Sequence, residues 1–213
     1  QPNSTKDQFI HRYEYDADNR IKQVYTSKDN VIWEKEANYL YYEHGPLARV
    51  EVGDKKVQVL DYIYTLQGWI KGVNSERIGF NDAGKDGLVV AKDAFGYALN
   101  YYTGDYKSRF NVNGNNNPID NTIFSFSKDL SGNSNLYNGN IKEMVTSLLN
   151  TSQQPIPTQF NYYKYDQLNR ISSMNSKAIS YTAGGATNSP VDGFKSNYSY
   201  DRNGNLDKTN VWA

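Results

Sequence analysis

The stretch "YKYDQLNRISSM", residues 163–174, decides the fold, because the same pattern returns elsewhere in the chain. Two tyrosines one residue apart lead into a polar turn, and an apolar pair follows the turn. Full copies of this pattern occupy residues 13–24, 39–50, 62–73, 163–174 and 198–209. A half-copy, "NGNIKEM", keeps Gly139, Ile141 and Met144 in register but lacks the tyrosines. Such recurrence is typical of a repeat protein.

Each full copy predicts a β-hairpin whose first strand carries a pair of tyrosines. Side chains alternate along a strand, so the Y-x-Y pattern places both rings on one face. Tyrosine suits a half-buried surface, because its ring packs while its hydroxyl reaches water. The paired residues are Tyr13 and Tyr15, Tyr39 and Tyr41, Tyr62 and Tyr64, Tyr163 and Tyr165, and Tyr198 and Tyr200.

The residues after the tyrosines predict a tight turn. Aspartate side chains accept hydrogen bonds from the backbone ahead of them, and such Asx-turns suit Asp16, Asp166 and Asp201. Near the end of the turn only Asn or Gly occurs, at Asn19, Gly45, Gly68, Asn169 and Gly204. These two residue types tolerate positive φ, so we expect a left-handed backbone at this position.

The second strand of each hairpin leaves one question open. Its apolar residues, such as Ile171 and Met174, are three positions apart and would point to opposite faces of a regular strand. Either a bulge returns them to one face, or both faces are partly covered. A single hairpin is marginal in water, so we expect the hairpins to stack edge to edge into a long, curving antiparallel sheet.

The copies "YEYDADNRI", "YKYDQLNRI" and "YSYDRNGNL" resemble the Rhs/YD-repeat family, which is named for its recurrent Tyr-Asp. Three further stretches resemble the version of the family found in Bacteroidota: "DYIYTLQGWIKGVN" (61–74), "DAFGYALNYYTGDYK" (93–107) and "LYNGNIKEM" (136–144). The resemblance implies a mostly β fold, in which stacked antiparallel hairpins form part of a spiral, hollow shell. In bacteria such a shell usually encloses a C-terminal variable domain, often a toxin. Related shells occur in insecticidal toxin complexes and in the animal teneurins.

We expect residues 1–213 to form one YD-repeat shell segment of a longer protein, with divergent spacer strands and loops over 75–161. Five repeats are too few for the complete shell that the resemblance implies. The sequence also lacks any Asp-Pro pair, which the family uses for self-cleavage near the end of its shell.

The amino-acid composition limits the classes of function and partner that the chain could have. The net charge is zero and the pI is near 6.9, so nothing favours nucleic acid or an anionic membrane as a partner. The 19 tyrosines supply much of the buried area that a low aliphatic content leaves missing. The absence of cysteine excludes a disulfide framework. No signal peptide and no apolar run long enough to span a bilayer is present in these residues.

Polar stretches predict loops between the hairpins, at residues 75–92, 111–120 and 183–193. The alternating Asp201, Asn203, Asn205 and Asp207 resemble a calcium loop, but glycine stands fourth where that loop needs it sixth. The hairpin turn already explains these residues.

A few other residues invite a chemical role. His11 and His44 are the only histidines, so no multi-histidine metal site can form, and a Ser or Thr nucleophile would depend on one of these two. We expect both to be structural. Trp33, Trp69 and Trp212 are expected to be packing anchors.

The stretch "IKEMVTSLL" has the apolar spacing of an amphipathic helix. Its register with the repeats instead makes 141–144 part of a strand, with room for a short helix after Met144. We favour the strand.

The leading hypothesis for function is therefore a non-enzymatic segment of a secreted or cell-surface shell, without cofactors, that encloses an effector or toxin domain in the manner of a polymorphic toxin. Its partners would be the remaining repeats of the parent shell, the enclosed domain, and secretion or surface machinery. The alternative is a binding module whose exposed tyrosines and Asn-rich loops recognise carbohydrate or a cell-surface protein. An enzyme is the weakest interpretation, because no acid–base pair or nucleophile stands out from the repeats.

Overall fold

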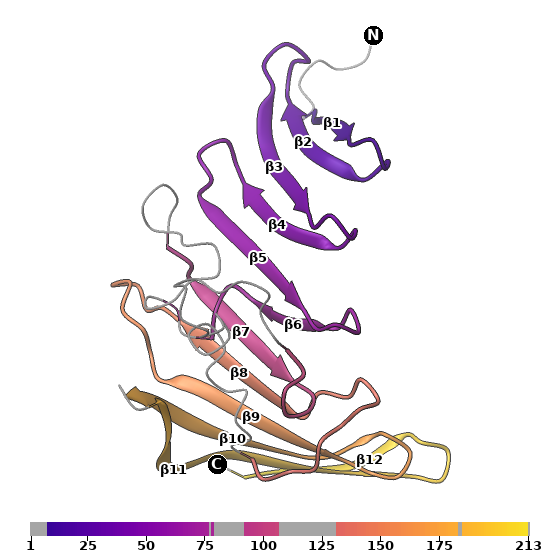
Figure 1. The fold of residues 1–213 in the computed structure, drawn as a ribbon, viewed down its shortest axis with the longest axis vertical. Helices are drawn as coiled ribbons and strands as arrows, with labels where there is room; N and C mark the ends of the chain where they lie inside the picture. Colours follow the sequence, from indigo (N-terminus) through magenta and orange to yellow (C-terminus); the bar gives the residue numbers. More distant parts are fainter. Residues whose placement is uncertain (1–7, 77, 79–91, 107–130, 183–184, 213) are drawn as a thin grey trace. The chain divides into compact units, whose positions relative to one another are not determined.

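The computed structural model describes residues 8–76, 78, 92–106, 131–182 and 185–212, and every regular element in them is a β-strand. The strands form one open antiparallel sheet in which each strand lies beside its neighbours in the sequence (Figure 1). The mostly β fold of stacked antiparallel hairpins is confirmed. The strands are β1 (Ile10–Tyr15), β2 (Ile21–Ser27), β3 (Glu34–Tyr41), β4 (Leu47–Val52), β5 (Gln58–Tyr64), β6 (Ile70–Val73), β7 (Phe95–Asn100), β8 (Glu143–Leu148), β9 (Thr158–Tyr165), β10 (Ile171–Thr182), β11 (Gly185–Tyr200) and β12 (Leu206–Trp212).

The chain divides into two compact units. The first contains β1 to β4 and most of β5, and the second begins at Ile63 and contains β6 to β12. The larger apolar core lies in the second unit, where Ala98, Val145, Phe160 and Ile179 from four neighbouring strands are at most 1% exposed. Burial of such side chains is the main stabilising contribution in a folded domain.

In four of the hairpins a bulge places the apolar residues of the second strand on the tyrosine face. In the first hairpin Tyr15 pairs with Ile21 and Tyr13 with Val24, and the register shifts between them so that Lys22 is the extra residue. The hairpins β3–β4, β9–β10 and β11–β12 show the same shift at the same place. Of the two alternatives that the sequence left open, the bulge is correct.

The turn prediction is confirmed at every aligned position. The φ angles are 60° at Asn19, 114° at Gly45, 84° at Gly68, 62° at Asn169 and 86° at Gly204. The half-copy obeys the same rule, since Gly139 has a φ of 88°. In each full copy the amide of this residue donates to the carbonyl three positions earlier, as Asn169 does to Asp166 at 3.0 Å.

The half-copy leads into a strand. Strand β8 runs from Glu143 to Leu148, and its residues alternate between buried and less buried positions, as a strand requires. The preference for a strand over a helix is thus confirmed for Glu143 and Met144. A short helix after Met144 is not formed, because β8 continues and pairs on both sides with β7 and β9.

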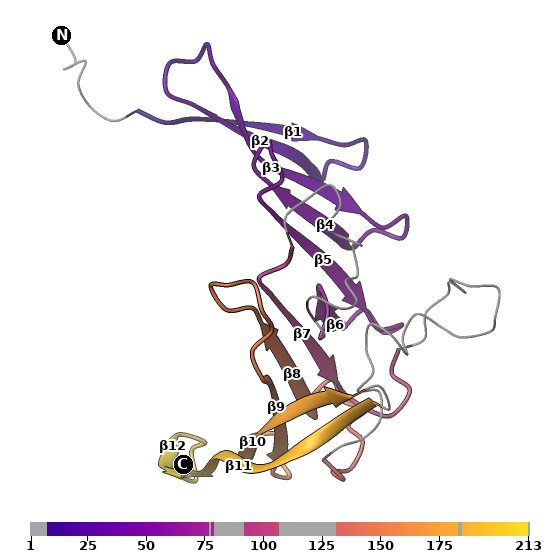
Figure 2. The same cartoon turned by 90° about the vertical axis from the view of Figure 1, so that its left-hand side faces the viewer.

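One loop prediction is wrong. Residues 185–193 belong to the long strand β11, which pairs with β10 and then with β12. Figure 2 shows β10 and β11 running side by side. Polar composition misled the sequence interpretation, because main-chain pairing needs no apolar side chain. Gly193 fits this pairing closely: a Cβ there would lie 2.4 Å from the carbonyl oxygen of Ser176.

The other loop predictions fall largely on residues outside the described ranges. These are all of 111–120, and 75–92 apart from residues 75, 76, 78 and 92.

Candidate functional site

Aspartates in three of the turns, Asp16, Asp166 and Asp201, hold their hairpins closed. In Asp166 one carboxylate oxygen accepts hydrogen bonds from the amides of Leu168 and Arg170, at 2.9 and 3.0 Å, and the other accepts from the Arg170 guanidinium at 2.7 Å. Asp16 is bound in the same way by Asp18 and Arg20. The hydrogen bonds from Arg170 hold the pKa of Asp166 below its ordinary value.

The last turn uses its aspartate in the same way. Asp201 accepts from the amides of Asn203 and Asn205 at 2.9 and 2.8 Å, and its second oxygen accepts from the Asn205 side-chain amide at 3.0 Å. The carboxylate is therefore committed to the hairpin turn, as the repeat pattern predicted. Within the described ranges, no group of three or more His, Cys, Asp or Glu could hold a metal ion.

In four places a tyrosine hydroxyl ties a strand to the hairpin before it, and we call this the inter-hairpin contact. Tyr41 donates to the carbonyl of Ile21, the first residue of β2, at 2.8 Å. The same contact is made by Tyr165 to Ile141 at 2.7 Å, by Tyr200 to Ile171 at 2.8 Å and by Tyr101 to Ile70 at 2.8 Å. The second tyrosine of a repeat thus has a structural task that the sequence pattern did not reveal.

The end of the ladder to the next strand explains why these carbonyls accept from a side chain. Pairing between β2 and β3 stops at Gln23, and pairing between β10 and β11 stops at Ser173, so the carbonyls of Ile21 and Ile171 lie beyond the ladder. A polar backbone group without a ladder partner needs another donor. The tyrosine hydroxyl supplies that donor.

An arginine covers the ring of the same tyrosine. The guanidinium of Arg20 lies 4.5 Å from the centre of the Tyr41 ring, and that of Arg170 lies 4.4 Å from the Tyr200 ring. Both arginines are fixed by ion pairs of 2.7 Å to the turn aspartates of their own hairpins. One hairpin therefore contacts a single tyrosine of the next hairpin in two ways. Its backbone carbonyl accepts from the tyrosine hydroxyl, and its arginine lies over the tyrosine ring.

We expected the tyrosine pairs to stack on their equivalents with substantially buried rings. Four of the five pairs are partly buried, but Tyr13 and Tyr15 in the first hairpin are 48% and 54% exposed. The guanidinium group of an arginine covers the rings of Tyr41 and Tyr200. The predicted stacking of tyrosine on tyrosine did not include this contact. Among the described residues no strand precedes β1, and Tyr15 accordingly has no preceding hairpin to meet.

The histidines and tryptophans pack against aromatic rings or cations. The ring of His11 lies 6.3 Å from that of Tyr13, and Trp69 lies 4.9 Å from Tyr101. His44 stacks on Tyr42 at 5.3 Å, and Trp33 lies under the guanidinium of Arg12 at 4.7 Å. The side chain of Trp212 is outside the described part of the structure.

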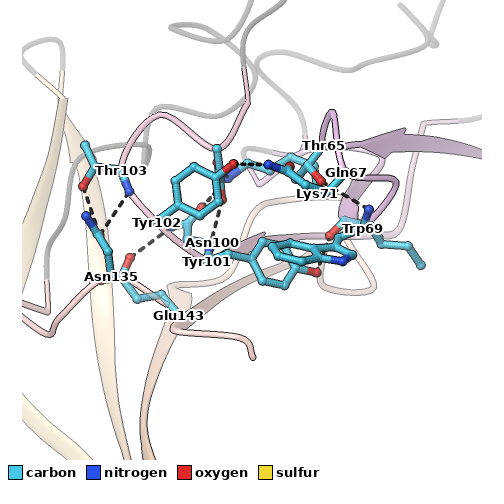
Figure 3. Close-up of polar contacts among 12 residues, drawn as sticks. Thr65, Gln67, Trp69, Lys71, Asn100, Tyr101, Tyr102, Thr103, Asn135 and Glu143 are labelled. Carbon is cyan, nitrogen blue, oxygen red and sulfur yellow. Dashed lines mark hydrogen bonds and ion pairs between the residues drawn. The ribbon is translucent and has the colours of Figure 1, made fainter. Parts of the chain in front are cut away.

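A second cluster lies in the second unit and is buried and charged (Figure 3). The ammonium of Lys71, on β6, donates to the side-chain carbonyl of Asn100, at the end of β7, at 2.7 Å. The amide nitrogen of Asn100 donates to the carboxyl group of Glu143, at the start of β8, at 3.1 Å. All three residues are at most 5% exposed. Three neighbouring strands therefore bring an amine, an amide and a carboxyl group into one line of contacts.

Asp105 completes the cluster as the counter-ion of Lys71. Its carboxylate lies 2.8 Å from the ammonium, and the two side chains are each 1% exposed. The second oxygen of Asp105 accepts from the amide of Tyr101 at 2.9 Å. Burial, together with the charge of Asp105, raises the pKa of Tyr101 to about 12. A buried charge pair is tolerable only when both members are well hydrogen-bonded, as they are here.

The carboxyl group of Glu143 accepts hydrogen bonds from the neutral side chains of Asn100 and Ser131. Burial raises its pKa above the ordinary value, although hydrogen bonds from Ser131 and Asn100 work in the other direction. The hydroxyl of Ser131 donates to it at 2.5 Å. The buried state thus favours the protonated carboxylic acid.

Sequence reasoning missed this cluster. Lys71 follows the isoleucine of its repeat, as Lys22 and Lys142 do in their copies, and looked like any residue of a repeat. Asn100, Asp105 and Glu143 lie in the stretch interpreted as a spacer. The only available signal was the unusual density of polar residues around the apolar "YALNYY".

Comparison with known proteins gives a likeness in structure and none in sequence. No known protein family and no curated protein matches the chain. Among solved structures, the crystal structure of TcdB2-TccC3 without its hypervariable C-terminal region matches with a TM-score of 0.56 and 15% identity, over 97% of this chain and 8% of that one. Crystal structures of TcdB2-TccC3 and of TcdB2-TccC3-TEV match at 10% identity with TM-scores of 0.38 and 0.37.

The first of these likenesses shows the fold. The class that the fold defines is an all-β protein whose stacked antiparallel hairpins form one open sheet. This chain spans about a twelfth of the length of that solved chain, given the 8% covered. No helix among the described residues is both long and apolar enough to cross a membrane.

Proposed function

We propose that this chain is a structural, non-enzymatic segment of an Rhs/YD-repeat shell that encloses a C-terminal effector or toxin domain. The observation that carries the proposal is the inter-hairpin contact. Four tyrosines repeat it with the same donor and the same kind of acceptor, which is how a wall of identical units is held together. We propose further that the parent protein is secreted or displayed at the cell surface, with the remaining repeats and delivery machinery as partners.

The mechanism of such a wall is exclusion. A sheet whose main-chain groups pair with each neighbour leaves no gap through which an enclosed polypeptide meets proteases. The tyrosine and arginine side chains at the bulges close the places where the main-chain ladder ends. The likeness in fold to TcdB2-TccC3 without its hypervariable C-terminal region supports this proposal.

Limited proteolysis of the parent protein tests enclosure. The segment that follows the repeats should resist a protease in the intact protein and become sensitive in the double variant Tyr41→Phe, Tyr200→Phe, which removes two inter-hairpin contacts. Tyr13→Phe is the matched control, because the Tyr13 ring is exposed. Equal cleavage of the following segment in the intact protein and in a version lacking the repeats would refute enclosure.

The second candidate function is a binding module for carbohydrate or a surface protein. It is favoured by the exposed rings of Tyr13 and Tyr15, since aromatic side chains often form the contact points of an interface. A glycan array and a pull-down with the chain decide between the two. Saturable binding that Tyr15→Ala abolishes would favour the binding module.

A further inference from the structure

The buried cluster in the second unit places an amine against a side-chain amide in a site shielded from water. Lys71 and Asn100 are 0% and 5% exposed, and the amine nitrogen lies 2.7 Å from the amide oxygen, one bond from the carbonyl carbon. Trp69 and Tyr101 pack against each other beside the cluster at 4.9 Å (Figure 3). Water that would hydrolyse an activated amide is therefore kept away from the pair.

We propose that Lys71 and Asn100 join through an intramolecular isopeptide bond, with Asp105 as the base and Glu143 as the acid. This inference concerns a modification of the chain itself and does not depend on the proposed shell function. It would make a covalent link between β6 and β7.

The base is in place for the first step. A lysine attacks only as the neutral amine, so its ammonium must lose a proton. The carboxylate of Asp105 lies 2.8 Å from the Lys71 nitrogen and can accept that proton. This transfer also converts a buried charge pair into two neutral groups, which suits a site of low polarity.

The acid lies on the other side of the amide. The leaving group is the Asn100 side-chain nitrogen, which is 3.1 Å from the Glu143 carboxyl group. Burial raises the pKa of Glu143 and so favours its protonated form, which can give a proton to that nitrogen as the bond breaks. A base beside the nucleophile and an acid beside the leaving group is the arrangement that acyl transfer needs.

The reaction balances without any further reactant. The Lys71 amine attacks the side-chain carbonyl carbon of Asn100 and forms the new C–N bond, and an electron pair moves to the carbonyl oxygen. The electron pair on the oxygen then re-forms the carbonyl, and the bond to the original Asn100 side-chain nitrogen breaks. That nitrogen takes the proton of Glu143 and leaves as ammonia. Glu143 then recovers a proton from the new amide nitrogen, and the proton held by Asp105 leaves with the product as ammonium.

A covalent link here would resemble a disulfide in effect. It would close the chain between residues 71 and 100, and cross-links that close loops reduce the freedom of the unfolded chain. The sequence has no cysteine, so no disulfide can do this.

Mass spectrometry of the purified chain tests the proposal. The intact mass should be lower than the sequence mass by one ammonia, and digestion with trypsin should give a branched peptide that joins the peptides of Lys71 and Asn100. The branched peptide is the decisive result, because an ammonia lost at an Asn-Gly turn leaves the two peptides separate. Separate peptides in the folded protein, or a water loss that links Lys71 to Asp105, would overturn the assignment.

Two variants and a control separate chemistry from folding. Glu143→Gln keeps the shape of the side chain and should abolish the branched peptide while circular dichroism stays unchanged. Lys71→Met should abolish it as well. Lys22→Met is the control, because Lys22 follows Ile21 as Lys71 follows Ile70, is exposed on β2, and takes no part in the proposed reaction. A branched peptide that persists in Glu143→Gln would refute the role of Glu143.

Discussion

At the scale of the residue, one backbone position explains the recurrence of Asn and Gly in the turns. All five aligned residues have φ between 60° and 114°. A side chain with a branched β-carbon is strained there, whereas asparagine is accepted at Asn19 and Asn169. The physical selection thus acts on the turn and not on any bound ligand.

Gly204→Val should destabilise the last hairpin by about 1–2 kcal/mol, because valine at a φ of 86° is forced into the left-handed region. Gly204→Asn is the matched control and should cost much less, since asparagine occupies the equivalent position in two other copies. Urea unfolding of both variants measures the difference. Equal losses for valine and asparagine would show that backbone strain is not the cause.

The turn aspartates should make the chain sensitive to acid. Hydrogen bonds from Arg170 lower the pKa of Asp166 below its ordinary 3.8 in the folded state. Its contribution is therefore fully present above pH 3.8 and is lost as pH falls through the lower folded pKa. Asp166→Asn should remove that part of the pH dependence. The check is the unfolding midpoint of both proteins along an acid series, in which a constant gap would contradict the prediction.

At the scale of the element, the bulge and the tyrosine act as one device. The ladder from β2 to β3 reaches only to Gln23, so the carbonyl of Ile21 lies beyond it and beside the bulge, and the second tyrosine of the next hairpin donates to this carbonyl. The arginine that the turn aspartate fixes then covers the ring. Removing any part should loosen the junction between two hairpins and leave each hairpin formed.

Tyr200→Phe should reduce the free energy of unfolding by about 1 kcal/mol, the usual net value of one hydrogen bond, because the carbonyl of Ile171 loses its donor. The ring and its contact with Arg170 remain. Tyr13→Phe, in the exposed first hairpin, should change stability by less than about 0.5 kcal/mol. Denaturant unfolding gives both values. Similar effects of the two substitutions would argue against a stabilising inter-hairpin contact.

At the scale of the whole molecule, the sheet is open. In the described structure β1 and β12 are the end strands of the order, so each presents main-chain groups without a further strand. Unpaired edges recruit other chains, and neither strand contains a proline to prevent it. In a longer shell the neighbouring repeats would cover both edges.

The isolated 213-residue chain should therefore associate with itself as its concentration rises. Light scattering over a concentration series should show a growing mass. Tyr13→Lys, which places a charge on the exposed first strand, should weaken the association. A stable monomer at all concentrations, with no partner present, would refute the expectation and indicate a domain that closes on itself.

The sequence by itself determined the hairpins, their turns and the left-handed positions, because these depend on neighbouring residues whose chemistry is visible in each copy. It also predicted a strand at Glu143 and Met144, through the register of the half-copy, whereas the continuation of β8 to Leu148 was seen only in the structure. Only the tertiary structure decided the bulge, the tyrosine contact to Ile171 and the pairing of polar β11, because these depend on what lies on the next strand. The cluster around Lys71 was beyond sequence reasoning for the same reason. Asn100 and Asp105, the partners of Lys71, lie 29 and 34 residues away along the chain. Only pairing of β6, β7 and β8 brings an amine, an amide and two carboxyl groups together.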